Sequence, residues 1–151
     1  MGPQHREQWM REALELAERA ERAGEVPVGC LVLGPDGSVL GRGRNRREQR
    51  ADATAHAELE AIRQACAALG SWRLDGCTLV VTLEPCPMCA GAIINARIST
   101  LVYGAREPLS GSCGSVIDLF QEHYGHAPAI YGGVLAEDCA ALLQRFFRDR
   151  R

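Results

Sequence analysis

Two short motifs restrict the fold most strongly, because their side chains form a chemical site only if they meet in space. The first is His56-Ala57-Glu58, and the second, Cys86-Pro87-Met88-Cys89, begins 28 positions after Glu58. One imidazole and two thiolates can hold a tetrahedral zinc ion and leave its fourth position open to water. We therefore predict a hydrolytic zinc site in which His56, Cys86 and Cys89 bind the metal and Glu58 transfers protons.

A Cys-x-x-Cys pair has other uses, because thiol redox proteins and structural zinc sites also contain it. A structural zinc site needs a fourth ligand, and the sequence offers no second pair of this kind. A redox pair can also lie between a strand and a helix, so its position does not exclude that class. The His-x-Glu motif one strand–helix unit earlier favours the hydrolytic interpretation over both.

The composition is that of a globular protein. The chain has 151 residues, of which 46% are hydrophobic and 24% charged, so we expect one domain over residues 1–151 with a single core. No apolar run approaches the roughly 18 residues of a membrane span, and the charged N-terminus has no secretion signal. We expect a cytoplasmic protein with no membrane association.

The cysteines are not arranged as a disulfide framework. There are seven, an odd number, scattered through apolar segments, which is typical of a protein in a reducing compartment. We expect four of them to be small buried side chains: Cys30, Cys66, Cys77 and Cys139. Cys113 lies in a Gly-Ser run that is typical of an exposed loop.

The basic residues are clustered. The net charge of −2 argues against an indiscriminate nucleic-acid binder. All 17 basic residues are arginine, five of them within 42–50 and four within 145–151. Arginine's planar fork suits phosphate. Genomic base composition explains the absence of lysine but not the clustering, and charge alone leaves a phosphate-binding surface and a solvated face equally open.

The hydrophobic periodicity predicts an α/β fold with a mixed, partly parallel sheet covered by helices. We expect helices over 8–23, 54–69 and 137–148, a third helix that begins at Pro85 or Pro87 and ends at about Ala96, a short helix over 116–120, and strands over 28–33, 38–41, 77–83, 100–103 and 129–131. Residues 42–53 are predicted to be irregular. Thr54 is the expected cap of the second helix, which places His56 and Glu58 in its first turn. Cys86 follows the carboxyl end of a strand, where open α/β sheets bind ligands.

Two further features bear on a substrate. Asn45 lies inside the first arginine cluster, where an asparagine is usually a turn residue. Phe146 and Phe147 are adjacent, so one of them must face away from the core, and exposed aromatic rings can stack on unpaired bases.

Several longer runs resemble the bacterial tRNA-specific adenosine deaminases. The zinc motif itself is shared by all cytidine deaminase-like enzymes, so it identifies only the superfamily. The Phe-Phe-Arg ending of the last helix is more specific for the tRNA branch. The similar runs cover residues 25–29, 54–58, 82–93, 102–106 and 132–140, and lead into 146–148.

The resemblance implies a three-layer α/β/α fold, a homodimer, one Zn²⁺ per chain, and conversion of the wobble adenosine of a tRNA anticodon to inosine with release of ammonia. It implies that His56, Cys86 and Cys89 bind zinc and that Glu58 is the proton shuttle. Asn45 would hydrogen-bond the flipped adenine. The other substrate-binding candidates are Ala57, Glu107, Phe147 and Arg148. Glu107 stands where the family often has aspartate, and the sequence ends at Arg151 without the longer basic tail of some relatives, which is expected to weaken tRNA binding.

Two expectations remain open at this point. A deaminase of a free nucleobase or nucleoside, of the guanine or cytosine type, is the main alternative, because the zinc chemistry would be the same. The arginine clusters beside Asn45 and Phe147 favour RNA, since a free base has no phosphate to bind. For the homodimer, the third helix offers Ala90, Ile93 and Ile94 as a candidate apolar surface.

Overall fold

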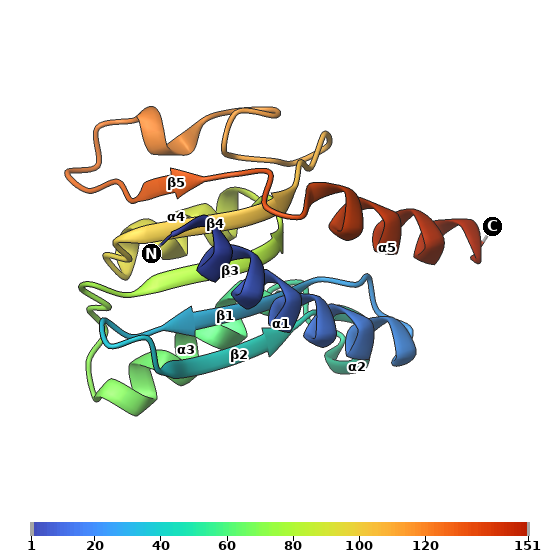
Figure 1. Ribbon diagram of the computed structural model, residues 1–151, viewed down its shortest axis with the longest axis horizontal. Helices are drawn as coiled ribbons and strands as arrows, with labels where there is room; N and C mark the ends of the chain where they lie inside the picture. The colour runs from blue at the N-terminus through green and yellow to red at the C-terminus, as the bar shows by residue number, and fades with distance from the viewer. Residues whose placement is uncertain (1, 151) are drawn as a thin grey trace.

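The computed structural model describes residues 2–150 and is built around a mixed five-stranded sheet (Figure 1). The strands lie in the order β2-β1-β3-β4-β5. β1 pairs antiparallel with β2 and β3, whereas β3–β4 and β4–β5 are parallel. The predicted mixed sheet is therefore confirmed. The strand bounds are β1 Gly29–Leu33, β2 Val39–Arg44, β3 Thr78–Leu83, β4 Thr100–Ala105 and β5 Ala129–Tyr131.

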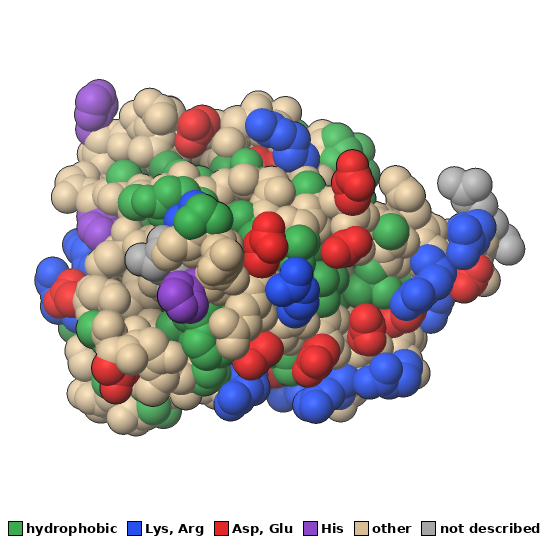
Figure 2. All heavy atoms as spheres, viewed as in Figure 1, with side chains coloured by type: hydrophobic (Ala, Val, Ile, Leu, Met, Phe, Trp, Pro, Cys, Tyr) green, Lys and Arg blue, Asp and Glu red, His purple; other side chains and the backbone are tan. Residues whose placement is uncertain are grey.

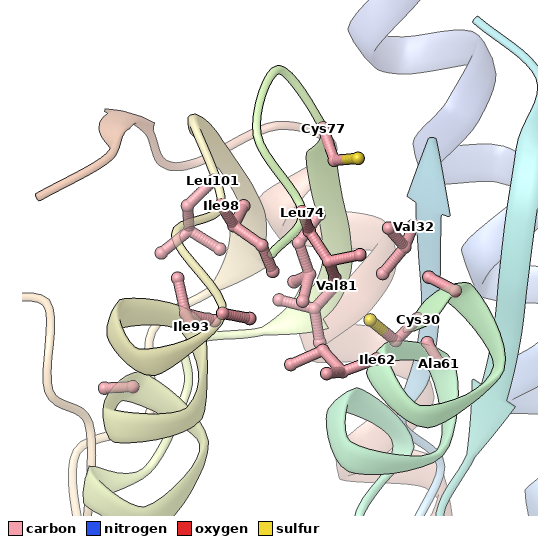
Figure 3. Packing of buried hydrophobic residues seen from close by; sticks show 14 of the residues in the cluster. Cys30, Val32, Ala61, Ile62, Leu74, Cys77, Val81, Ile93, Ile98 and Leu101 are labelled. Atoms are coloured by element: carbon pink, nitrogen blue, oxygen red, sulfur yellow. The ribbon is translucent and has the colours of Figure 1, made fainter. Parts of the chain in front are cut away.

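Helices cover both faces of this sheet, which gives three layers. α1 and α5 pack on one face over Leu31, Val80 and Val102. α3 and α4 pack on the other face, where Ala61 and Ile62 lie against strand β1 and Ile93 lies near Leu101 (Figure 3). The bounds are α1 Pro3–Arg22, α2 Arg47–Arg50, α3 Ala57–Leu69, α4 Pro87–Asn95, the 3₁₀ helix η1 Leu119–Gln121 and α5 Ala136–Arg148.

Strand β2 is longer than predicted, and the reason lies in its glycines. It continues through Arg44, so the expectation of irregular structure from residue 42 was wrong. A Cβ on Gly41 or Gly43 would lie 2.1 Å from a backbone carbonyl of α3. The two glycines therefore let the start of α3 lie directly on the strand. This contact fixes the helix that carries the first motif.

The start of α3 also differs from the prediction. The helix begins at Ala57, with His56 rather than Thr54 as the N-cap residue. Thr54 instead bonds Asp52, to which its backbone N–H and its hydroxyl both donate. Gly70 ends the helix in the left-handed region, with φ of 64°, as expected for a C-terminal glycine.

The candidate dimer surface on α4 was predicted wrongly. Ala90 and Ile93 are fully buried and Ile94 is 5% exposed, and all three belong to the core between α4 and the sheet. Their helical spacing reflects packing within the chain. They are therefore not available to a second copy.

Other local expectations had mixed outcomes. Cys30, Cys77 and Cys139 are buried and Cys66 is half-buried, whereas Cys113 is half-buried rather than exposed. The short helix expected over 116–120 is reduced to η1. Within residues 2–150, no helix is long and apolar enough to cross a membrane.

Candidate active site

The fold brings His56, Cys86 and Cys89 together. Nδ1 of His56 lies 3.7 Å from Sγ of Cys86 and 3.6 Å from Sγ of Cys89. All three candidate ligand atoms lie within 4.8 Å of one another. With zinc bonds of about 2.3 Å to sulfur and 2.1 Å to nitrogen, tetrahedral angles place nitrogen and sulfur about 3.6 Å apart. The donor set and its spacing therefore fit a zinc ion.

Two helix N-termini hold these side chains. His56 is the N-cap residue of α3 and has extended backbone, with φ of −85° and ψ of 152°. Cys86 is the N-cap residue of α4, just beyond the carboxyl end of β3, and Cys89 lies in the first turn of α4. The free N–H groups and dipole of a helix N-terminus stabilise negative charge. The site is thus favourable for thiolates.

The two thiols differ in their proton affinity. A hydrogen bond from the Cys89 thiol, aided by His56, outweighs burial and lowers the pKa of Cys86 to about 4. The pKa of Cys89 is raised, first because this thiol donates to Cys86 and second because it is buried. The His56 pKa is raised, chiefly by its hydrogen bond with Cys86. The surroundings therefore favour the thiolate form of Cys86, which is the form that binds metal.

Glu58 lies beside this cluster in a buried position. It is 4% exposed and lies in the first turn of α3. Burial is the largest cause of the rise of its pKa to about 7. A carboxyl group whose pKa lies near neutrality can both accept and donate a proton. The group is thus suited to the proton transfer predicted for it.

These residues line a cleft of about 270 Å³. His56, Glu58 and Cys86 lie on its wall, whereas Cys89 is fully buried behind it. Four of the five predicted substrate-binding residues also line the cleft: Asn45, Ala57, Glu107 and Phe147. Six other residues that the sequence did not single out as substrate contacts also line it: Val26, Val28, Arg47, Leu83, Glu84 and Leu109. Four of these six lie in the runs 25–29 and 82–93 that resemble the deaminases, so the resemblance was a signal that could have found them.

The chain matches known proteins over nearly all of its length. Residues 4–151 match the family described as MafB19-like deaminase. The chain belongs to this deaminase family. A tRNA-specific adenosine deaminase of Bacillus subtilis is 47% identical over 146 residues, which cover 96% of this chain and 90% of the relative.

The chain is also similar to parts of longer proteins. A tRNA(Ile)-lysidine synthase of Deinococcus deserti is 54% identical over 142 residues, 94% of this chain but 27% of the relative. A second such synthase, from Deinococcus radiodurans, is matched over 24% of its length. The chain therefore spans about a quarter of the length of these two relatives.

Solved structures confirm the predicted three-layer fold of the cytidine deaminase-like type. One, from studies of A-to-I editing by tRNA:A34 deaminases at the wobble position of transfer RNA, has a TM-score of 0.84 and 45% identity, and the match covers 89% of this chain and 98% of that chain. A guanine deaminase from Nitrosomonas europaea has a TM-score of 0.82 and 28% identity, and the match covers 93% of this chain and 83% of that chain.

In this MafB19-like deaminase, Asn45 is both a turn residue and a cleft residue. Its Oδ1 accepts the backbone N–H of Arg47 at 3.2 Å, and its Nδ2 donates to the carbonyl oxygen of Val26 at 3.3 Å. An amide has two N–H groups and two acceptor lone pairs, so one of each remains. The fold thus orients Asn45 and leaves part of its hydrogen-bonding capacity facing the cleft.

The C-terminal helix supplies one aromatic side chain to the cleft. Phe146 is 5% exposed and packs inward, whereas Phe147 is 51% exposed and lines the cleft, which confirms that the two rings face different ways. Arg148 lies outside the cleft lining and pairs with Asp149 at 3.5 Å on the surface. The helix is held by a bidentate pair between Arg145 and Glu21 of α1.

The arginine clusters divide into structural and exposed members. Basic side chains gather along the lower edge and at the end of the molecule where α1 and α5 end (Figure 2). Arg46 and Arg50 both pair with Glu60, and Arg150 lies 3.6 Å from the ring centroid of Phe146. Arg47 lines the cleft, and no ion pair to it occurs within residues 2–150. Arg151 lies outside the described residues.

Proposed function

We propose that residues 1–151 form a zinc-dependent deaminase domain that converts the wobble adenosine of a tRNA anticodon to inosine and releases ammonia. The observation that carries the proposal is the meeting of the His56–Cys86–Cys89 cluster with Glu58 in one cleft. Similarity over nearly the whole chain to a tRNA-specific adenosine deaminase supports the same reaction. Formation of inosine in an anticodon stem-loop is the direct test. Such a substrate would place the activity in the cytoplasm.

The residues of the chain divide the chemistry between them. His56, Cys86 and Cys89 would hold one zinc ion, which when bound supplies a Lewis acid that makes water acidic near neutral pH. Glu58 accepts a proton from the attacking water, as the water oxygen bonds to the carbon that carries the amino group, and delivers this proton to the adjacent ring nitrogen of adenine. Glu58 then takes the remaining proton of the added hydroxyl group and passes it to the amino group. The carbon–nitrogen bond breaks, ammonia leaves, and the carbon–oxygen bond becomes the carbonyl of inosine. Its burial and its pKa of about 7 suit both transfers.

The cleft is shaped for a base that has left its stack. Asn45 has hydrogen-bonding groups left for the edge of a purine, and the exposed ring of Phe147 offers a stacking surface. Val26, Val28 and Leu83 supply an apolar lining. These features support binding of a flipped adenine, with Glu107 and Ala57 as further contacts.

A deaminase of free guanine is the second candidate, because a guanine deaminase has nearly the same fold. The exposed side chain of Arg47 at the cleft distinguishes between the two candidate substrates. A free base carries no phosphate, whereas RNA places phosphates on both sides of the base that is bound. Arg47 on the cleft wall and the exposed Arg148 therefore favour an RNA substrate.

We expect Arg47→Ala and Arg148→Ala to weaken binding of an anticodon stem-loop and to reduce its salt dependence. Each phosphate contact that is lost should lower the slope of log Kd against log salt concentration by about 0.7. Titrations at several salt concentrations measure this slope. Arg63→Ala is the matched control, since Arg63 is exposed on α3 away from the cleft lining. Unchanged slopes in both variants would remove these arginines from the phosphate contacts.

We also propose a homodimer. Its interface cannot be formed by Ala90, Ile93 and Ile94 of α4, because these side chains lie in the core. Exposed apolar side chains lie instead at Met88 and at Val116 and Ile117, which are 54% and 44% exposed. We expect light scattering at micromolar concentration to give a molar mass twice that of one chain. A double variant with Val116→Asp and Ile117→Asp should have a lower molar mass, because charged side chains would replace the exposed apolar ones. Leu69→Asp, at the far end of α3, is the control. A stable, active monomer of the unaltered chain would contradict the dimer.

A further inference from the structure

Besides Glu58, two further glutamates near the cleft are buried, Glu25 and Glu84. Glu25 is 1% exposed and Glu84 is 2% exposed. Within residues 2–150 neither forms an ion pair with a basic side chain. Burying a carboxylate is costly unless hydrogen bonds compensate for the lost water. The donors that compensate here come from two segments that line the cleft.

Glu25 holds the first of these segments, residues 45–50, which we call the arginine wall. The backbone N–H of Glu48 donates to one oxygen of Glu25 at 3.0 Å, and that of Gln49 donates to the other at 2.7 Å. With the bond from Arg47 to Asn45, all three N–H groups at the start of α2 have acceptors. A four-residue helix is not stable by itself. Its position, and that of Arg47 and Asn45 at the cleft, therefore depends on Glu25.

Glu84 holds the second segment, residues 107–115, which we call the loop wall. The backbone N–H groups of Glu107, Cys113 and Ser115 donate to its two oxygens at 3.0, 2.8 and 3.2 Å. The hydroxyl of Ser115 donates as well. Four donors fill about all the lone pairs of a carboxylate.

The backbone of the loop wall is shaped to this carboxylate. A Cβ on Gly111 would lie 2.4 Å from the carboxyl carbon of Glu84, so only glycine allows the loop to approach this closely. Glu107 in turn accepts the backbone N–H of Leu109 at 2.9 Å. Glu107 and Leu109 are the two loop-wall residues at the cleft. Their placement thus follows from Glu84.

We infer that Glu25 and Glu84 are positioning residues that set the arginine wall and the loop wall for the nucleotides around the target base. The inference rests on the proposed function for its substrate. Neither residue is assigned to the chemistry, because within residues 2–150 the hydrogen bonds of both carboxylates go to the two walls. Hydrogen bonds to a charged acceptor are stronger than neutral ones, so both walls are firmly fixed.

Glu25→Gln and Glu84→Gln test whether these two side chains position the walls. The glutamine amide keeps the shape of the glutamate side chain but replaces one acceptor oxygen with an N–H donor. We expect each to raise KM for an anticodon stem-loop about tenfold, to change kcat less than twofold and to keep the zinc content of the unaltered chain. Hydrogen exchange should accelerate at Glu48 and Gln49 in the first variant only, and at Cys113 and Ser115 in the second only.

Two further variants separate positioning from general stability. Val102→Ala removes buried methyl groups from the sheet core, and we expect it to lower Tm but not to change KM below the transition. Ser115→Ala keeps the Glu84 carboxylate and removes one of its donors. We expect it to raise KM relative to the unaltered chain, by less than about tenfold, so the test remains valid if Glu84→Gln fails to fold.

The outcomes are distinct. Unchanged KM and unchanged amide exchange in both glutamine variants would overturn the inference. So would loss of zinc with a fall in kcat, since this would make the glutamates supports of the metal site. If the unaltered chain forms no inosine, the proposed function fails, and the amide exchange still decides whether the two glutamates hold the walls.

Discussion

Glu58→Ala is expected to keep about one zinc ion per chain and to lose about two to four orders of magnitude in kcat. The side chain is buried beside the cysteines but is not one of the three clustered metal ligands. Removing it takes away the group that transfers protons while the ligands stay in place. Metal analysis and single-turnover rates on the same preparation measure the two quantities.

Two more variants sharpen this test. Glu58→Gln preserves the shape of the side chain and should be equally inactive, because an amide cannot transfer the proton. Glu15→Ala, an exposed residue of α1 on the other face of the sheet, should retain full activity. Loss of zinc from Glu58→Ala would instead make Glu58 a ligand, and the proposed proton-transfer role would be wrong.

Removal of any one ligand should abolish activity together with metal binding. We expect His56→Ala, Cys86→Ala and Cys89→Ala each to cut the zinc content sharply, since two remaining ligands hold a zinc ion weakly. Chelation of the unaltered protein should inactivate it, and zinc should restore activity. Cys66→Ala is the control, because this half-buried cysteine lies outside the cluster.

The same experiment addresses the redox alternative. A thiol redox pair would form a titratable disulfide between Cys86 and Cys89 and would be indifferent to chelators. It would also not require His56. Retention of full activity after complete removal of zinc would contradict the metal-dependent mechanism.

The architecture followed from the sequence because its signals are local. Alternating apolar strands and amphipathic helices predicted the mixed sheet, and the strand over 129–131 has the predicted bounds. The first motif had to lie at a helix N-terminus, because residues two apart on a regular helix point away from each other. In the second motif Cys86 and Cys89 are three apart, so they can share one face of the first turn. His56 and Cys86 occupy the N-cap positions of α3 and α4.

The features that were missed depend on contacts between distant parts of the chain. Gly41 and Gly43 resemble strand breakers until the backbone of α3 is seen against them. Ala90 and Ile93 have the spacing of an apolar surface, but the spacing does not say whether the core or a second copy covers it. The hydrogen bonds of Glu84 reach 23 to 31 positions along the chain, beyond any local pattern.

Side-by-side assay of an anticodon stem-loop, free adenine, free guanine and cytidine tests the central claim most directly. Ammonia release and inosine formation are measured for each substrate under the same conditions, with Glu58→Ala as the blank. We predict turnover of the stem-loop with inosine at the wobble position and little turnover of the free compounds. Turnover of guanine or cytidine with none on the stem-loop would contradict the RNA substrate and leave the zinc chemistry standing.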